Sequence, residues 1–369
     1  MSEPREPEVL DDGAEVEAQR AIRERKRQSS VRELRTQVRV LERENERLDT
    51  ENVYLLGLEA HQPKPFRIRP RSKRENASGK NHCLPVLLAS DWHMGERVRP
   101  ETVNGLNEYS PEIAEERARA FFRNAHRLID IQRGGATITE ALLWLGGDLM
   151  TGYIHEEFEE ENFLSPIEEA ELVFDTFVSG IDYLLASADI EKLLIPTSHG
   201  NHGRTGKKQR ISSGARNSFE WGLYHRLRKH YAKEPRVGFQ IADGYLNYVE
   251  LKDGNGESIW LRFHHGDGIR YYGGVGGLEI PLNKSIYAWN TLPRPGSSVA
   301  CPATCDFLGH WHQYIPGSRA VTNASLIGLN AYALWIKAKF EEPQQAFCMV
   351  DLSGGAGRRV FGHFPIRVT

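Results

Sequence analysis

VLLASDWHMG, residues 86–95, is the stretch that decides the fold class of this 369-residue chain. Residues 86–90 form an apolar run without polar alternation, which predicts a short strand buried on both faces. Asp91 and His93 follow, so a carboxylate and an imidazole stand where that strand ends. In open α/β sheets, ligands bind beyond the carboxyl ends of the strands. The stretch therefore predicts an α/β domain with a polar site at one sheet edge.

An apolar run followed by polar side chains recurs further along the chain. Residues 141–145 (ALLWL) precede Asp148, and residues 192–197 (KLLIPT) precede Asn201 and His202. Each run has the length and composition of a buried strand. The sequence thus predicts two more strands whose ends carry Asp, Asn or His.

Helical segments separate these runs. Ser110 and Ser165 are each followed by proline, which predicts an N-cap and a first helical residue at both places. We expect these helices to end near residues 133 and 188, and a third helix at 213–232. Strands that alternate with helices of this length are typical of parallel βαβ units.

Shorter strand-like segments follow residue 237, which predicts that antiparallel strands join the sheet structure. His264 and His265 stand at the end of one such segment, and His310 and His312 follow the run CDFL. Five strand ends would therefore bring aspartate, asparagine and histidine side chains to one rim.

These side chains favour a metal site over other chemistry. Carboxylate, imidazole and amide oxygen suit manganese, iron or zinc, and the absence of a thiolate argues against a structural zinc site. A carboxylate that bridges two cations allows them to hold a phosphate and to lower the pKa of a bridging water, whose hydroxide attacks phosphorus. A further imidazole can stabilise the transition state or protonate the leaving oxygen.

The motifs occur in a defined order: D-x-H, G-D, G-N-H, H-G and G-H-x-H. They read Asp91-Trp92-His93, Gly147-Asp148, Gly200-Asn201-His202, His265-Gly266 and Gly309-His310-Trp311-His312. Across about residues 85–325 this order resembles the calcineurin-like metallophosphoesterases. The layout is similar to phage- or prophage-encoded members and to the SbcD-type DNA repair nucleases.

The resemblance implies a fold and a role for each residue. The fold would be α/β, with two packed mixed β-sheets flanked by helices in a four-layer sandwich. Two divalent metal ions would be bound, with manganese expected and iron or zinc as alternatives. Asp91, His93 and His312 would hold the first metal, Asn201, His265 and His310 the second, Asp148 would bridge both, and His202 would contact the scissile phosphate as the catalytic residue. His265 is preferred over His264 as a ligand because it directly precedes Gly266.

One departure from the family pattern bears on the substrate. Gly203 and Arg204 follow the G-N-H block, where the protein serine/threonine phosphatases of the superfamily favour an acid. That branch is therefore disfavoured, and an acid is also missing soon after Asp148.

The substrate prediction depends on a basic loop. Arg204, Lys207, Lys208 and Arg210 could contact a phosphate backbone, which favours a metal-dependent nuclease acting on DNA or RNA. Seven glutamates in residues 156–169 would repel a polyanion or instead cap a helix and face water. Two alternatives stay open: a phosphatase or phosphodiesterase for small-molecule or protein esters, and a coiled-coil adaptor with a vestigial metal site. Exonuclease and endonuclease action are not distinguished.

The N-terminal quarter predicts a separate organisation. Residues 1–18 are expected to be an acidic disordered head, 19–58 a basic helix and coiled coil, 59–83 a basic linker, and 84–369 the metallophosphoesterase domain. Val31, Val38, Asn45 and Asn52 occupy heptad position a, and Leu34, Leu41, Leu48 and Leu55 occupy position d. This pattern favours a two-stranded coiled coil over residues 31–55, pairing two copies or a partner protein, over a lone amphipathic helix.

Composition sets the outer limits. The net charge of −3 excludes a globally basic nucleic-acid binder, and 40% hydrophobic residues exclude a wholly disordered chain. The sequence has no long apolar run and no apolar segment near its N-terminus, so we expect no membrane contact and a cytoplasmic location. Four cysteines do not make a disulfide framework, so reduced thiols are expected.

Overall fold

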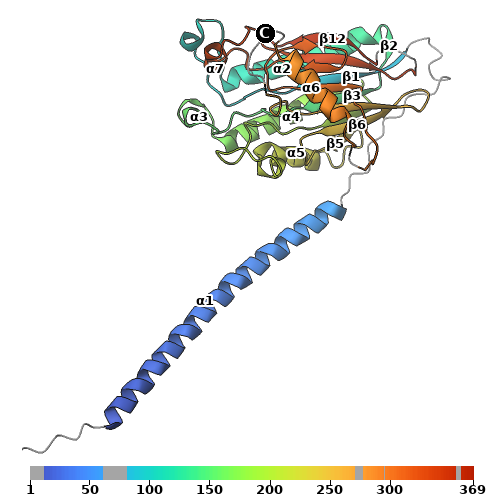
Figure 1. Cartoon of the computed structure of the whole chain (residues 1–369). Coiled ribbons are helices and arrows are strands. Elements are labelled where there is room, and N and C mark those ends of the chain that lie inside the picture. The colour runs from blue at the N-terminus through green and yellow to red at the C-terminus, as the bar shows by residue number, and fades with distance from the viewer. Residues whose placement is uncertain (1–11, 61–80, 271–276, 295, 355–358) are drawn as a thin grey trace, which may run out of the picture. The chain divides into compact units, whose positions relative to one another are not determined.

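Two mixed β-sheets lie at the centre of the larger part of the chain in the computed structural model (Figure 1). The structure describes residues 12–60, 81–270, 277–294, 296–354 and 359–369. The chain divides into two units, residues 1–64 and residues 65–369. The expected α/β class with two mixed sheets is confirmed in the second unit.

The first sheet has the order β12-β11-β1-β3-β4-β5, with β2 beside β1. Strands β1, β3, β4 and β5 run parallel, β11 is antiparallel to β1, and β12 is antiparallel to β11. The bounds are β1 (Asn81–Ala89), β2 (Ala136–Thr137), β3 (Glu140–Leu145), β4 (Lys192–Pro196), β5 (Val237–Gln240), β11 (Gln344–Asp351) and β12 (Val360–Arg367).

The second sheet has the order β6-β7-β8-β10-β9. Strands β7, β8 and β10 are parallel, and β6 and β9 are antiparallel to their neighbours. The bounds are β6 (Asn247–Lys252), β7 (Ser258–Phe263), β8 (Cys305–Leu308), β9 (Ile315–Pro316) and β10 (Ala320–Thr322).

Helices cover the outer faces of the sheets. The larger ones of the second unit are α2 (Pro111–Arg133), α4 (Pro166–Ser187), α5 (Phe219–His230) and α6 (Glu279–Asn290). Shorter turns are α3 (Glu156–Glu161), α7 (Ala331–Trp335) and the 3₁₀ segments η1 (Pro100–Val103) and η2 (Ala215–Asn217). The Ser–Pro starts of α2 and α4 are as predicted, because the Ser110 and Ser165 hydroxyls accept backbone N–H groups of the first turn.

Alternation along β1 explains the layering. Leu84, Val86 and Leu88 belong to an apolar cluster that includes residues of β6, β7 and β8, so this cluster lies between the sheets. Leu87 and Ala89 belong to a second cluster shared with α2, α4 and α5. Successive strand residues point to opposite faces, so β1 is buried on both. A third cluster joins α6 to the second sheet through residues such as Leu308.

Several sequence-based boundaries are wrong. The helix predicted at 213–232 begins at Phe219, because the Ser218 side chain caps it there. Helix α1 (Asp12–Ala60) begins inside the segment 1–18 that we expected to be disordered, and β1 begins at Asn81, inside the predicted linker 59–83. Residues 1–11 and 61–80 lie outside the described residues.

Helix α1 exposes its predicted coiled-coil seam in the single chain. The a and d residues Val31, Leu34, Val38, Leu41 and Leu48 are between 41% and 66% exposed. The long N-terminal helix is thus confirmed, and its pairing stays a prediction. The side chain of Leu55 lies outside the described residues. Among the described helices, none is both long and apolar enough to cross a membrane.

Candidate metal centre

The loops that follow five strands meet at one edge of the two sheets. Backbone hydrogen bonds connect them: the Asp91 N–H donates to Gly147 O (3.0 Å), and the Gly309 N–H donates to His265 O (2.8 Å). The first bond joins the loops after β1 and β3, and the second joins the loops after β8 and β7. The His310 N–H also donates to the Asp91 carboxylate (2.9 Å), so this edge brings together residues that are more than 200 positions apart in the sequence.

Three groups of side chains at this edge could hold a metal ion. In each group the ligand atoms lie within 4.8 Å of one another, among the residues that the structure describes. The groups are Asp91, His93 and His312; His93, Asp148 and His202; and Asp148, His265 and His310. The sequence predicted six of these seven residues as ligands and the seventh, His202, as the catalytic group.

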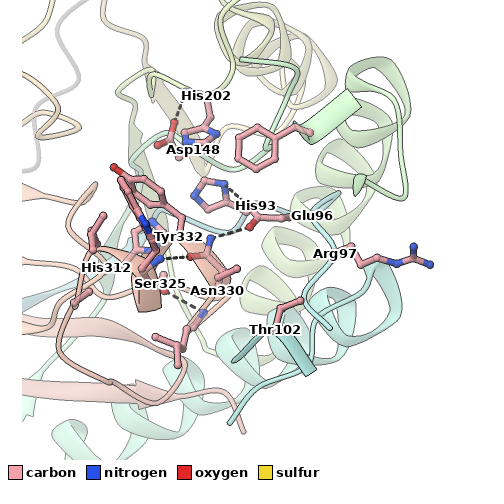
Figure 2. Close-up of a pocket in the computed structure, with 18 of the residues that line it drawn as sticks. His93, Glu96, Arg97, Thr102, Asp148, His202, His312, Ser325, Asn330 and Tyr332 are labelled. Carbon is pink, nitrogen blue, oxygen red and sulfur yellow. Dashed lines mark hydrogen bonds and ion pairs between the residues drawn. The ribbon is translucent and has the colours of Figure 1, made fainter. Parts of the chain in front are cut away.

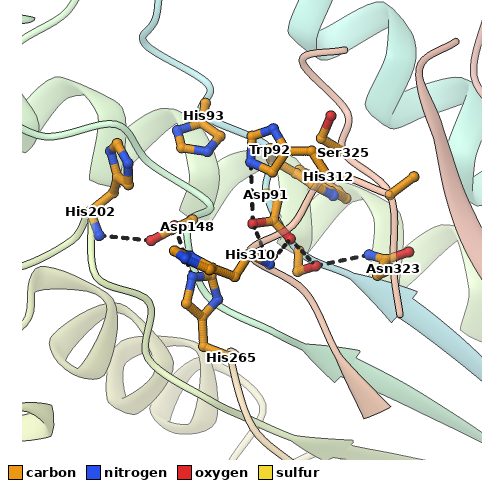
Figure 3. Close-up of polar contacts among 12 residues, drawn as sticks. Asp91, Trp92, His93, Asp148, His202, His265, His310, His312, Asn323 and Ser325 are labelled. Carbon is orange, nitrogen blue, oxygen red and sulfur yellow. Dashed lines mark hydrogen bonds and ion pairs between the residues drawn. The ribbon is translucent and has the colours of Figure 1, made fainter. Parts of the chain in front are cut away.

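Asp148 lies between the groups. Its Oδ2 is 2.9 Å from His265 Nε2, and its Oδ1 accepts the His202 backbone N–H (2.7 Å) (Figure 3). His265 Nδ1 donates to Gly146 O (2.8 Å), which leaves Nε2 facing the carboxylate. Burial disfavours the charged forms of the Asp148 carboxylate and the His265 ring. The attraction between these two groups nevertheless lowers the pKa of Asp148 and raises that of His265. A backbone acceptor that fixes the second ring nitrogen is typical of metal-ligating histidines.

Asp91 organises the first group. Its carboxylate accepts the His310 backbone N–H (2.9 Å) and lies 3.5 Å from His312 Nε2 (Figure 3). The Ser90 hydroxyl donates to the same carboxylate, and Asn323 donates to that hydroxyl. Asp91 is therefore held from both sheets.

The backbone at these residues is strained. Asp91, His93, Asp148, His310 and His312 all have φ between +49° and +69°, the left-handed region. A non-glycine residue there costs about 1–3 kcal/mol, and such residues cluster at functional sites. These five are the majority of the eight such residues in the described part of the chain. The strain is explained if ligand geometry, rather than stability, dictates these turns.

Buried polar atoms without hydrogen-bond partners point to the same conclusion. Both ring nitrogens of His93 and the Oδ1 atom of Asn201 lack a partner within the described structure. An unpaired buried polar atom costs about 1–3 kcal/mol. Burial, together with His202 and His312, keeps the pKa of His93 well below its ordinary value, so its ring is neutral and carries a lone pair. A cation would satisfy these atoms, so the residues present fit a metal ion.

His202 has a different environment from the other histidines. Its Nδ1 donates to Thr151 O (3.0 Å), and burial lowers its pKa. Its ring packs edge-to-face against His93, with 4.6 Å between ring centroids. A neutral His202 with Nδ1 occupied has only Nε2 available to a ligand.

His264 faces away from this cluster. Its Nε2 is 3.4 Å from Asp306 Oδ1, and its ring contacts Trp289. It is in none of the three metal-competent groups among the described residues. The geometry therefore favours His265, the residue that reaches Asp148, as the ligand of this pair.

Two glycines are required by close approach. A Cβ atom at Gly200 would overlap the Asp148 carboxylate, and one at Gly309 would overlap the Asp91 carboxylate. The glycines of the G-N-H and G-H-x-H blocks therefore make room for the two aspartates.

Buried glutamates that the sequence analysis missed support the loops. Glu220 accepts the backbone N–H groups of Leu149 (2.8 Å) and Gly200 (2.7 Å), and Glu169 accepts those of Thr151 and Gly152. Burial raises the pKa of each glutamate to about 8. Their signal was an acid on the apolar stripe of a helix, as Glu220 shows with Leu223, Tyr224 and Leu227 at helical spacing.

Glu96 was also missed. Its Oε2 lies 3.6 Å from His93 Nδ1, and its Oε1 accepts the Asn330 side-chain amide (2.8 Å) (Figure 2). It therefore connects a predicted ligand to the start of α7. Its only signal in the sequence is its place three residues after His93.

A cavity of about 730 Å³ opens above the cluster. His93, Asp148, Asn201, His202, His310 and His312 line its floor. Its described wall includes five glutamates against three bases, and it carries the aromatic residues Phe158, Trp311, Tyr332 and Trp335. The acids are Glu96, Glu157, Glu161, Glu341 and Glu342, and the bases are Arg97, Arg99 and Lys339.

The predicted phosphate-binding loop does not line this cavity. The Arg204 guanidinium donates to the carbonyls of Asn201 (2.8 Å), Gly206 and Lys207, so it braces its own loop. Lys207 pairs with Glu156 (3.0 Å), and Arg210 donates to Asn217. Arg204, Lys208 and Arg210 instead border a separate hollow of about 30 Å³ beside Asn201.

The acidic segment 156–169 has several separate uses. Glu168 forms a capping box with Ser165 at the start of α4, and Glu161 pairs with Arg99 (3.3 Å). Glu169 is buried beneath the metal-site loops.

Comparison with protein-family models and with curated proteins gave no match for this chain. The geometry and chemistry of the site are therefore the basis for its function.

Proposed function

We propose that this protein is a dinuclear-metal-dependent phosphoester hydrolase of the calcineurin-like type, and that it acts as a nuclease on DNA or RNA. The observation that carries the proposal is the cluster in which metal-competent groups share His93 and Asp148. Overlapping groups can hold two cations close together, as two-metal phosphoesterases require. The two mixed sheets with helices outside are the arrangement that this family would have.

Each residue of the cluster would have a distinct role. Asp91, His93 and His312 would hold one cation, and Asn201, His265 and His310 the other. Asp148, which lies between the groups, would contact both. When bound, two divalent cations supply Lewis-acid charge to a phosphoester and lower the pKa of water. Manganese is the expected metal, and iron or zinc suits the same nitrogen and oxygen donors.

His202 would hold and donate a proton at the leaving oxygen. Its Nδ1 is fixed by Thr151 O, so Nε2 is the atom that can reach a substrate. A general acid placed in this way contributes about 10²–10⁴-fold to the rate. The lowered pKa of His202 arises from burial, and a bound phosphate dianion or diester would oppose that effect.

A second candidate is a phosphatase or phosphodiesterase of smaller or protein-borne esters. The observation that favours it is the glutamate-rich cavity wall, which repels a polyanion beyond the metal-bound phosphate. The basic residues Lys208 and Arg210 lie outside this cavity and therefore would contact nucleic acid only at its periphery. The third reading, a coiled-coil adaptor with a vestigial site, is disfavoured because no expected ligand has been replaced.

Cleavage assays with a panel of substrates distinguish these functions. Metal-stripped protein with added Mn²⁺ would be given labelled single- and double-stranded DNA and RNA, bis-p-nitrophenyl phosphate and p-nitrophenyl phosphate. Nucleic-acid cleavage that is lost in His202→Ala supports the nuclease. Turnover of the small esters alone would replace it with the second candidate, and no turnover of any substrate would leave the adaptor.

We also propose that α1 associates with a second copy of this chain. Exposed apolar residues at both heptad positions leave an unpaired seam on a helix of 49 residues. Most of the stability of helices in proteins comes from packing of an apolar face. Pairing along 31–55 would bury that face.

A further inference from the structure

We infer that α7 and the residues after it form a stacking platform for the unpaired bases of single-stranded nucleic acid. The platform is defined by Tyr332, Trp335 and Ile336. This inference rests on the proposed phosphodiesterase function and specifies its substrate class.

The platform is unusually exposed. Tyr332 is 65% exposed and Trp335 is 78% exposed, and Leu334 and Phe340 beside them are more than a third exposed. No described residue of α7 is buried, and among them only Ala333 packs against the main apolar cluster. Contiguous exposed apolar side chains of this kind mark binding surfaces.

The platform lines the same cavity as the metal ligands. Tyr332, Trp335 and Ile336 form part of the wall of the 730 Å³ cavity whose floor carries His93, Asp148 and His202. Figure 2 shows Tyr332 and Asn330 at the cavity beside His93 and Glu96. A phosphate held at the floor would therefore present its attached nucleoside to this wall.

The start of the platform is anchored to a metal-site residue. The Asn330 side chain caps α7 by accepting the Ala333 N–H (2.9 Å), and its amide donates to Glu96 (2.8 Å). Glu96 in turn contacts the ring of His93. The aromatic pair is thus positioned relative to the predicted first metal.

The end of the platform is anchored in the same way. Gln313, directly after His312, donates to Lys339 O (2.9 Å), and the Tyr314 N–H donates to Glu341 (2.9 Å). Both ends are therefore connected to the chain beside a metal ligand. A surface that served only to bind another protein would not need both of its ends to be joined to residues beside the predicted metal ligands.

The chemistry of the wall favours bases over other occupants. The rings of Tyr332 and Trp335 lie 6.1 Å apart at 35° and contact each other, and both are largely exposed, so a flat ring can stack on their exposed surfaces. Aromatic side chains bind single strands by stacking with every base, whereas duplex bases already stack on one another. The wall also contains Arg97 and Lys339, so a nearby phosphate has cationic neighbours, while the glutamates disfavour a long polyanion. One or two nucleotides at a strand end or in a gap satisfy all of these conditions.

Fluorescence of 2-aminopurine tests the platform directly. Short DNA and RNA strands carrying this base at one end would be titrated with the His202→Ala protein and Mn²⁺, so that turnover is slow. Stacking quenches the base, and we expect Tyr332→Ala and Trp335→Ala, each combined with His202→Ala, to remove the quenching. The affinity should fall about 5- to 150-fold for each ring. Tyr332→Phe, which keeps the ring, should restore both.

The matched control is Tyr287→Ala on α6. Tyr287 is 75% exposed and is not among the described residues of the cavity wall, so its removal should leave quenching unchanged. Thermal melting of each variant would verify folding, which is expected because both platform rings are exposed.

Kinetics separate failure of this inference from failure of the proposed function. The kinetic test uses protein that retains His202 and compares kcat/KM on single strands with kcat/KM on bis-p-nitrophenyl phosphate. We expect Tyr332→Ala to lower the ratio of the first value to the second at least tenfold. An unchanged ratio with active enzyme, or equal losses on single strands and duplex, would overturn the platform. Loss of binding to protein partners or vesicles with an unchanged ratio would likewise overturn it. An enzyme inactive on every phosphodiester would overturn the proposed function itself.

Discussion

Replacement of Glu220 should destabilise the protein, because this buried side chain holds two loops of the candidate metal site. Its two carboxylate oxygens accept the N–H groups of Leu149 (2.8 Å) and Gly200 (2.7 Å), which flank Asp148 and Asn201 in sequence. Glu220→Ala removes both acceptors and leaves two buried donors unpaired. Each such donor costs about 1–3 kcal/mol, so the free energy of unfolding should fall by about 2–6 kcal/mol. Glu220→Gln retains one acceptor and should cost about half as much.

Metal affinity should fall in the same order. Loss of a group that orients metal ligands weakens binding about 10- to 100-fold. Urea denaturation followed by tryptophan fluorescence measures the first quantity, since all seven tryptophans lie in the second unit. Calorimetric titration with Mn²⁺ measures the second.

Glu171→Ala is the control for Glu220. Glu171 is exposed and pairs with Arg226, and such pairs contribute at most about 1 kcal/mol. If Glu220→Ala is no more destabilising than Glu171→Ala, or if it binds Mn²⁺ as tightly as the unaltered protein, the role assigned to Glu220 is refuted.

Three further predictions concern other parts of the chain. Gly309→Ala should displace the Asp91 carboxylate and reduce both Mn²⁺ content and ester turnover, and normal values of both would refute the close approach. Burial raises the pKa of Glu169 to about 8, above its unfolded value, so the folded state binds more protons and the free energy of unfolding should fall as the pH rises from about 4.5 to 8. Glu169→Gln should flatten that fall in denaturation measured across this pH range, and an unchanged slope would contradict the assignment. Leu41→Glu should convert the full chain to monomer in sedimentation. Val40→Glu should not, because Val40 is also exposed but does not lie at heptad position a or d.

The strands and the ligand loops were predictable because each depends on local sequence. Buried parallel strands are continuous apolar runs, and a polar residue directly after such a run must emerge at the sheet edge. The Ser–Pro helix starts depend on one cap and one fixed φ, which are also local. For this reason the sequence alone predicts that Asp91, Asp148 and Asn201 lie at one edge of the sheet.

The supporting contacts were not predictable because they depend on tertiary geometry. Glu220 and Glu169 lie on apolar helix stripes but belong to no motif, and the loop N–H groups that they accept are defined only once α4 and α5 pack under the loops. The basic loop illustrates the opposite difficulty. Its charges suggested a phosphate-binding site, but the Arg204 guanidinium donates to neighbouring backbone carbonyls. These contacts depend on the conformation of the loop backbone.

Helix α6 was missed as an element, and the sequence left residues 329–340, where α7 lies, open as a strand or a short helix. Helix α7 has five residues and no buried face, so no apolar periodicity could have indicated it. Its importance depends on its place beside the metal-site cavity, which only the fold defines.

Equilibrium dialysis of the metal-stripped chain against Mn²⁺, with bis-p-nitrophenyl phosphate turnover measured on the same samples, tests the central claim most directly. The proposed dinuclear centre requires two Mn²⁺ ions per chain and turnover that rises with the second. Asp148→Asn, which lacks the shared carboxylate, should lose tight binding at both sites and all measurable turnover. Retained binding of two ions and normal turnover in Asp148→Asn, or no Mn²⁺ bound by the unaltered chain, would contradict the assignment.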